Sequence, residues 1–169
     1  MADVSGGRVV HDFLPAETFE AIVDAAPLVS IDLVVRDQNG HVLLGRRNNR
    51  PAQGYWFVPG GRIRKNESLE SAFTRLTKDE IGIESEICSA TYLGLYEHFY
   101  DDSIFTEAGK LVSTHYVVNG FEIVVDSADM SLPEQQHNDY CWQSEAELLT
   151  NPEVHIHSKW YFQKDKGFL

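Results

Sequence analysis

One segment, residues 55–83, constrains the fold more than any other part of the chain. A short apolar run at 55–58 leads through a proline to the glycine pair Gly60 and Gly61. Glycine lets the backbone turn sharply and approach a ligand closely. An amphipathic stretch, 67–81, follows and ends at Gly82, a residue typical of helix C-termini. The segment therefore predicts a strand, a tight loop and a helix in direct succession.

The remaining elements mix strands and helices without regular alternation. We expect helices at 15–26, 144–149 and 154–163, and strands at 28–36, 41–46, 92–100, 114–125 and 139–143. Such a mixture favours a mixed sheet flanked by helices over a doubly wound parallel sheet. The predicted fold class is α+β, an α/β/α sandwich.

Length and charge limit the organisation and the partners. The chain has 169 residues, and we expect one domain, 1–169, with 1–12 as a frayed N-terminal extension. A net charge of -12 argues against nucleic-acid binding, so an anionic substrate needs local cations or a metal ion. Without a secretory signal or an apolar run of membrane-spanning length, we expect a cytoplasmic protein that binds no membrane, with Cys88 and Cys141 reduced.

The predicted helix 67–81 carries several carboxylates. Among them, Glu80 lies one turn beyond Leu76, so the two side chains share a face that can point back at the glycine loop. Carboxylate and carbonyl oxygens suit a hard cation such as Mg²⁺.

This segment resembles the signature of the Nudix hydrolases. The matching positions are Gly61, Glu67, Arg75, Leu76, Thr77, Asp79, Glu80, Gly82 and Ile83. Leu76 and Asp79 depart from the signature, which has Glu at both positions. The loss of a carboxylate at 76 suggests fewer metal ions and a general base supplied from elsewhere.

Four further blocks resemble one subfamily, the GDP-mannose mannosyl hydrolases. That subfamily also has Leu at the position that corresponds to Leu76. The blocks are 49–62, 97–102, 114–118 and 132–137, and the resemblance covers residues 13–162. It implies that water attacks the anomeric carbon of GDP-mannose, or also of GDP-glucose, with inversion, and that GDP and free hexose are released.

The resemblance also implies a metal site and a general base. One Mg²⁺ per subunit, replaceable by Mn²⁺, would be held by the Gly60 carbonyl, the Glu80 carboxylate and the Gln136 side chain. His137 would be the base, since a neutral imidazole can accept a proton near neutral pH.

The other residues carried over from the resemblance would contact substrate. Arg47, Arg62 and Tyr116 would bind phosphate, and a planar guanidinium can bind it through two hydrogen bonds. Asp32 and His98 would lie near the sugar. Phe19 would pack on guanine from the partner subunit of a homodimer.

Simpler interpretations remain open. Glu80 could be a solvated helix charge, and His98 a hydrogen-bonded core histidine. His155 and His157 are expected at an exposed helix start, and Arg75 is expected to brace Asp79 or a loop carbonyl. Two other functions also fit: an ordinary Nudix pyrophosphohydrolase that yields GMP and sugar phosphate, which Leu76 disfavours, and a nucleotide-sugar sensor without catalysis.

Overall fold

The computed structural model describes residues 13–107, 109–132 and 137–169, and of residues 137 and 138 it describes only the backbone. The predicted N-terminal extension, 1–12, lies outside this part of the chain. The described strands form a seven-stranded mixed sheet, in which the order β3-β2-β1-β6-β5 is extended by β4 pairing with β1 and β7 pairing with β2. The strands are β1 (Leu28–Arg36), β2 (Val42–Arg47), β3 (Trp56–Phe57), β4 (Gly60–Arg62), β5 (Thr91–Tyr100), β6 (Thr114–Val124) and β7 (His137–Gln143).

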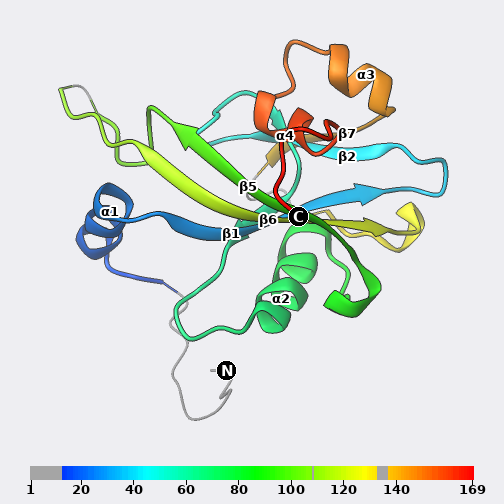
Figure 1. Cartoon of the computed structure of the whole chain (residues 1–169), viewed down its shortest axis with the longest axis horizontal. Helices are drawn as coiled ribbons and strands as arrows, with labels where there is room; N and C mark the ends of the chain where they lie inside the picture. The colour runs from blue at the N-terminus through cyan, green and yellow to red at the C-terminus, as the bar shows by residue number, and fades with distance from the viewer. Residues whose placement is uncertain (1–12, 108, 133–136) are drawn as a thin grey trace.

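Helices cover both faces of this sheet (Figure 1). They are α1 (Ala16–Ala25), α2 (Leu69–Ile81), α3 (Glu145–Thr150) and α4 (Ile156–Trp160), with short 3₁₀ turns η1 (Ile87–Ser89) and η2 (Ser127–Asp129). Figure 1 shows α2 on one side of the sheet and α3 and α4 on the other. The predicted mixed sheet between helices is confirmed.

Strand β1 lies at the centre of the fold and separates two hydrophobic cores. It runs parallel to β6 and antiparallel to β2 and β4. Because successive side chains on a strand point to opposite faces, Val34 enters the core beneath α3 and α4, whereas Ile31 and Leu33 enter the core that contains α2. Burial on both faces explains why almost every residue of this strand is inaccessible.

Two elements differ from the sequence prediction. Residues 60–62, predicted as a turn, form the short strand β4 opposite residues 30–32 of β1. The C-terminal helix, predicted over 154–163, is confined to α4. Alternation and helical periodicity are weak guides for segments this short, in which tertiary contacts decide the conformation. Within the described ranges, no helix combines the length and the apolar character needed to cross a membrane.

The ends of α2 are fixed by local hydrogen bonds. The Ser68 side chain accepts a hydrogen bond from the backbone N–H of Ser71, and Gly82 ends the helix in the left-handed conformation at φ 73°. A β-carbon at Gly82 would also overlap the backbone of Ser131. The C-terminal end of α2 therefore has no room for a side chain.

We predict that Gly82→Ala destabilises the protein more than Gly40→Ala. Both glycines have positive φ, 73° and 81°, but a β-carbon at Gly40 has nothing within 4 Å. The left-handed conformation costs alanine about 1–2 kcal/mol at either site, and the overlap with Ser131 adds about 1–3 kcal/mol at Gly82 alone. Equal losses in the free energy of unfolding, measured by urea denaturation, would contradict this account.

Candidate active site

The glycine loop lies directly against β1. Gly60 faces Asp32 in the β1–β4 pairing, and a β-carbon on Gly60 would lie 2.5 Å from the Ile31 carbonyl oxygen and 2.6 Å from Asp32 Oδ1. A β-carbon on Gly61 would lie 2.7 Å from Leu76 Cδ2. The two glycines therefore allow β4 to pack between β1 and α2. Leu76 is 2% exposed, as expected for a core residue.

Glu80 lies one turn further along the same face of α2, and it is only 2% exposed. Burial raises the pKa of Tyr140 in β7 to about 12, and the negative charge of Glu80 adds to that effect. This face of α2 is therefore directed toward both the glycine loop and β7. Of the two alternatives for Glu80, the solvated helix charge is excluded by its burial.

The donors available here fit a hard cation. The predicted ligands Gly60 and Glu80 offer a carbonyl oxygen and a buried carboxylate, and Mg²⁺ prefers oxygen ligands. The third predicted ligand, Gln136, lies outside the described residues. His137 is the first residue of β7, and its backbone pairs with Arg47 of β2. Among the described side chains no group of three or more His, Cys, Asp or Glu could hold a metal.

Arg75 braces the start of this loop–helix unit. Its guanidinium donates to both carboxylate oxygens of Glu67, at 2.6 and 2.9 Å, and to the Arg62 carbonyl at 3.0 Å. It also lies 3.8 Å from the Asp79 carboxylate. The predicted bracing role of Arg75 is therefore confirmed, and it fixes the backbone next to the predicted phosphate-binding residue Arg62.

A second set of polar residues lies on the α4 face of the sheet, where Asp32 is 8% exposed. The Tyr161 hydroxyl donates a hydrogen bond to Asp32 Oδ2 at 2.6 Å. Burial raises the pKa of Asp32 to about 6, although the Tyr161 hydrogen bond and the positive charge of Arg47 both oppose this rise. Asp32 is therefore mostly ionised at neutral pH but becomes protonated in mild acid.

The charge of Arg47 acts on this carboxylate and on two partly buried tyrosines. Burial raises the pKa of Tyr116 and of Tyr100, while the nearby charge of Arg47 opposes both rises. The two tyrosine rings meet edge to face with their centroids 6.2 Å apart. The structure thus brings together Asp32, Arg47 and Tyr116, which are more than 80 residues apart at their extremes.

Arg62 and Phe19 are also brought together. The Arg62 guanidinium carbon lies 4.5 Å from the centroid of the Phe19 ring, and Phe19 packs edge to face against Phe105 at 5.6 Å. A guanidinium over an aromatic face is attracted by the ring quadrupole. Within one subunit, Phe19 is therefore positioned beside the predicted phosphate-binding Arg62.

His98 belongs to an array of three histidines. It is 2% exposed, and its ring stacks on that of His157 with centroids 4.2 Å apart and planes 7° apart. His155 lies 4.8 Å from His157. The expectation that His155 and His157 form an exposed helix start is wrong, because His157 is 5% exposed and α4 packs onto the sheet. His98 Nε2 has no hydrogen-bond partner among the described residues, unlike the expected hydrogen-bonded core histidine.

Two residues near these groups, Tyr161 and Tyr100, are not among the predicted site residues, and His157 is predicted to be exposed. Tyr161 and His157 reach Asp32 and His98 because the α4 segment packs onto the sheet, whereas Tyr100 lies two residues from His98 on β5. No local pattern marks the contacts that the α4 segment makes.

Comparison with known proteins identifies a family. A model of the NUDIX domain matches residues 26–163. The low-salt glycan biosynthesis protein Agl8 of Haloferax volcanii is 44% identical over 122 residues, which cover 72% of this chain and 74% of that protein. The ADP-ribose pyrophosphatase of Methanocaldococcus jannaschii is 34% identical over 70 residues, 41% of this chain and 40% of that protein.

Solved structures share the fold at lower identity. The MutT protein of Methanosarcina mazei superimposes with a TM-score of 0.64 at 24% identity, covering 82% of this chain and 92% of that one. A MutT NUDIX hydrolase of Burkholderia pseudomallei superimposes with a TM-score of 0.63 at 23% identity, and the match covers 83% of this chain and 98% of that chain.

We predict that the protein loses stability as pH falls below about 6.5, the usual histidine pKa. Burial lowers the pKa of His98 to about 2, of His157 to about 3 and of His155 to about 4. The unfolded chain then binds more protons than the folded one, so acid favours unfolding. For His98 the loss between pH 7 and pH 5 is about 2 kcal/mol.

The pH dependence of His98→Asn tests this origin. The variant should unfold more easily at pH 7, because its packing is altered, yet its free energy of unfolding should fall less between pH 7 and pH 5. Denaturant titrations at several pH values measure both quantities. A slope equal to that of the wild-type protein would show that His98 is not kept neutral by the fold.

Proposed function

Because the chain belongs to the Nudix hydrolase family, whose members act on nucleotide-linked substrates with divalent metals such as Mg²⁺, we propose that it hydrolyses GDP-mannose, and also GDP-glucose, to GDP and free hexose. The observation that carries this proposal is the packing of Leu76. A side chain with no ligand atom fills the space against Gly61 where the family signature has a carboxylate. The similarity to a glycan biosynthesis protein supports a sugar-linked substrate.

The proposed reaction breaks a carbon–oxygen bond. Water attacks the anomeric carbon, and its oxygen forms the new bond with inversion. The electron pair of the broken bond stays on the β-phosphate oxygen, so GDP leaves intact, and His137 takes the proton from the attacking water. The pairing of the His137 backbone with Arg47, a predicted phosphate-binding residue, supports this role.

Charge separation in this reaction explains the two polar sets. Positive charge develops at the anomeric carbon, where the buried Asp32 carboxylate would stabilise it and His98 would line the sugar side. Negative charge develops on the diphosphate, where Arg47, Arg62 and Tyr116 would bind. A carboxylate would therefore stabilise the positive anomeric carbon, and cationic side chains would stabilise the negative diphosphate.

The metal site would serve the departing diphosphate. The Gly60 carbonyl, the Glu80 carboxylate and the Gln136 side chain would hold one Mg²⁺ or Mn²⁺, whose charge supports the leaving group. Burial of Glu80 strengthens its interaction with a cation, because water screens the charge less.

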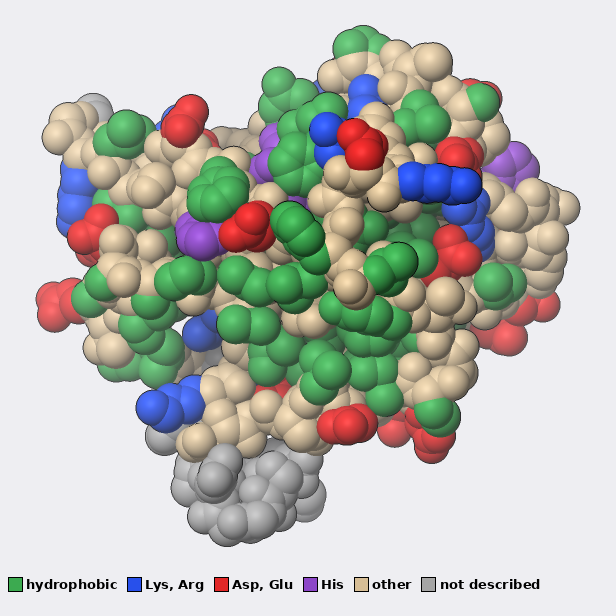
Figure 2. Space-filling view, in the orientation of Figure 1, with side chains coloured by type: hydrophobic (Ala, Val, Ile, Leu, Met, Phe, Trp, Pro, Cys, Tyr) green, Lys and Arg blue, Asp and Glu red, His purple; other side chains and the backbone are tan. Residues whose placement is uncertain are grey.

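We also propose a homodimer in which Phe19 contacts guanine of the partner's substrate. Large exposed apolar side chains occur on β1, β5, β6 and the C-terminus, among them Val29, Tyr92, Phe99, Val124 and Phe168. Figure 2 shows hydrophobic side chains gathered across the middle of one face, over the region where Figure 1 places β5 and β6. Extended apolar patches of this kind are typical of protein interfaces.

The first test is product analysis in oxygen-18 water. With GDP-mannose and Mg²⁺, we expect labelled mannose and unlabelled GDP by mass spectrometry, because water attacks carbon. GMP and mannose phosphate carrying label on a phosphate would overturn the proposal in favour of the pyrophosphohydrolase. Binding without turnover of any nucleotide sugar would favour the sensor.

A second prediction concerns Glu80→Gln. The amide has nearly the same shape but lacks the charge, so turnover should fall by about 100-fold or more, and the Mg²⁺ concentration giving half-maximal activity should rise. Glu70→Gln, on the exposed side of the same helix, is the matched control and should retain both values. Unchanged Mg²⁺ dependence in Glu80→Gln would remove Glu80 from the metal site.

A further inference from the structure

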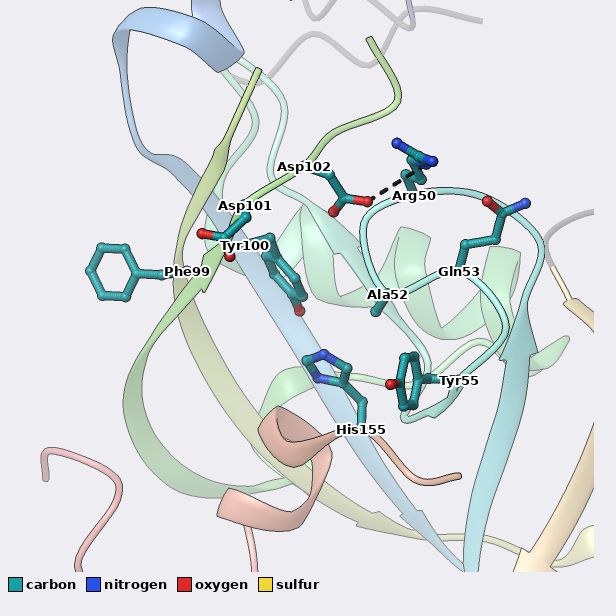
Figure 3. A pocket seen from close by; sticks show the side chains of 9 residues that line it. All are labelled: Arg50, Ala52, Gln53, Tyr55, Phe99, Tyr100, Asp101, Asp102 and His155. Carbon is teal, nitrogen blue, oxygen red and sulfur yellow. Dashed lines mark ion pairs between the residues drawn. The ribbon is translucent and has the colours of Figure 1, made fainter. Parts of the chain in front are cut away.

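A pocket of about 440 Å³ opens between the β2–β3 loop and the end of β5 (Figure 3). Its volume lies within the range of about 300–1,000 Å³ typical of small-molecule sites. The loop between β2 and β3, the end of β5 and the residue that precedes α4 line it. Its polar and aromatic lining includes Arg50, Tyr55, Tyr100, Asp101, Asp102 and His155.

Tyr100 and His155 join this pocket to the candidate active site. The Tyr100 ring meets the ring of His98 edge to face at 6.4 Å and the ring of Tyr116 at 6.2 Å, measured between centroids. The His155 ring lies 4.8 Å from that of His157, which stacks on His98. A ligand in this pocket therefore lies next to the groups proposed to face the anomeric carbon and the phosphates.

The charges in the pocket argue against a phosphate ligand. Arg50 Nε lies 3.6 Å from the Asp102 carboxylate, and Asp101 adds a second negative charge. The single cation of the lining is therefore already matched by a carboxylate, whereas Arg47 and Arg62 lie outside the lining. An uncharged ligand fits this environment better than an anion.

The remaining lining suits a ligand rich in hydroxyl groups. Arg50, Gln53 and Tyr55 offer donors, and Asp101 and Asp102 offer strong acceptors. Opposite the ion pair, the rings of Tyr55, Tyr100 and His155 lie around the same space (Figure 3). Tyr55 meets His155 edge to face at 5.2 Å, and His155 lies 5.5 Å from Tyr100. A polar side facing an aromatic side matches the two kinds of surface on a pyranose ring.

We propose that this pocket binds the glycosyl group of the substrate and that the Arg50–Asp102 ion pair selects among sugars by the pattern of their hydroxyl groups. The inference rests on the proposed function and adds specificity-determining residues to it. The ion pair can do this because its partners are partly exposed, at 45% and 33%, and so remain accessible to a ligand. Each carboxylate oxygen of Asp102 accepts hydrogen bonds only from hydroxyl groups that point toward it.

The test compares GDP-mannose with GDP-glucose, which differ at one hydroxyl group. For the wild-type protein, Asp102→Asn and Arg50→Gln, kcat/KM is measured for both substrates, together with inhibition by GDP. We expect the ratio of the two kcat/KM values to change by about 10-fold or more in each variant, because hydrogen bonds to charged groups are lost. Inhibition by GDP, which has no glycosyl group, should stay within twofold.

A matched control is Glu153→Gln. It breaks the Arg46–Glu153 ion pair, which has a similar separation of 3.4 Å and lies outside the pocket lining, so it should leave the ratio unchanged. A ratio that is unaltered in Asp102→Asn and Arg50→Gln overturns the inference. So does a parallel weakening of GDP inhibition, because the ion pair would then act on the nucleotide.

Failure of this inference can be told from failure of the proposed function. The products reveal which bond is broken, whereas the ratio of kcat/KM values reports sugar selection for either cleavage. If the products are GDP and free hexose but the ratio is unaltered, the proposed function is supported and the pocket is excluded as the glycosyl site. If the products are GMP and sugar phosphate and the ratio is altered, the proposed function is excluded and the pocket is supported as the glycosyl site.

Discussion

The close approach of Gly60 to β1 is the constraint on which the site depends. Any side chain at this position would collide with the Ile31 carbonyl, so only glycine lets β4 pair there. Once β4 is in place, Gly61 receives the Leu76 side chain, and α2 docks with one face toward the sheet. The buried position of Glu80 follows one turn later along that face. A backbone contact thus determines where the acidic side chain lies.

Strand β1 also separates the two charge environments that the proposed reaction needs. Its backbone pairs with the glycine loop in β4, and α2, which bears the Glu80 carboxylate, packs against that loop. Its Asp32 side chain faces the opposite way, into a layer of aromatic rings closed by α4. Gly120 permits this closure, because a β-carbon there would lie 3.0 Å from the rings of Tyr161 and Tyr96. Asp32 therefore accepts the Tyr161 hydrogen bond in a buried setting.

Sequence alone predicts the features whose residues lie close together along the chain. The strand–glycine–helix unit and the Arg75 brace follow from patterns within about a dozen residues, and both are present. The Tyr161–Asp32 bond, the histidine array and the pocket were not predicted, because their residues come from segments that lie far apart in the sequence. His157 shows the reason: a histidine near a helix start suggests exposure until the docking of that helix is known. The roles of Gln136 and His137 remain predictions, since their side chains lie outside the described part.

The histidine array and Leu76 have a common physical effect, which is to limit charge around the proposed sugar site. A carboxylate at position 76 would bring another metal-binding group toward the diphosphate, whereas leucine only packs. On the other face, burial keeps the three imidazoles neutral, so they add no cation beside Asp32. A protonated histidine there would compete for the Asp32 carboxylate and weaken its effect on a positive anomeric carbon. In the proposed reaction, Arg47 and Arg62 would bind the phosphates and the buried Asp32 carboxylate would face the sugar, an arrangement that would favour cleavage at carbon over attack at phosphorus.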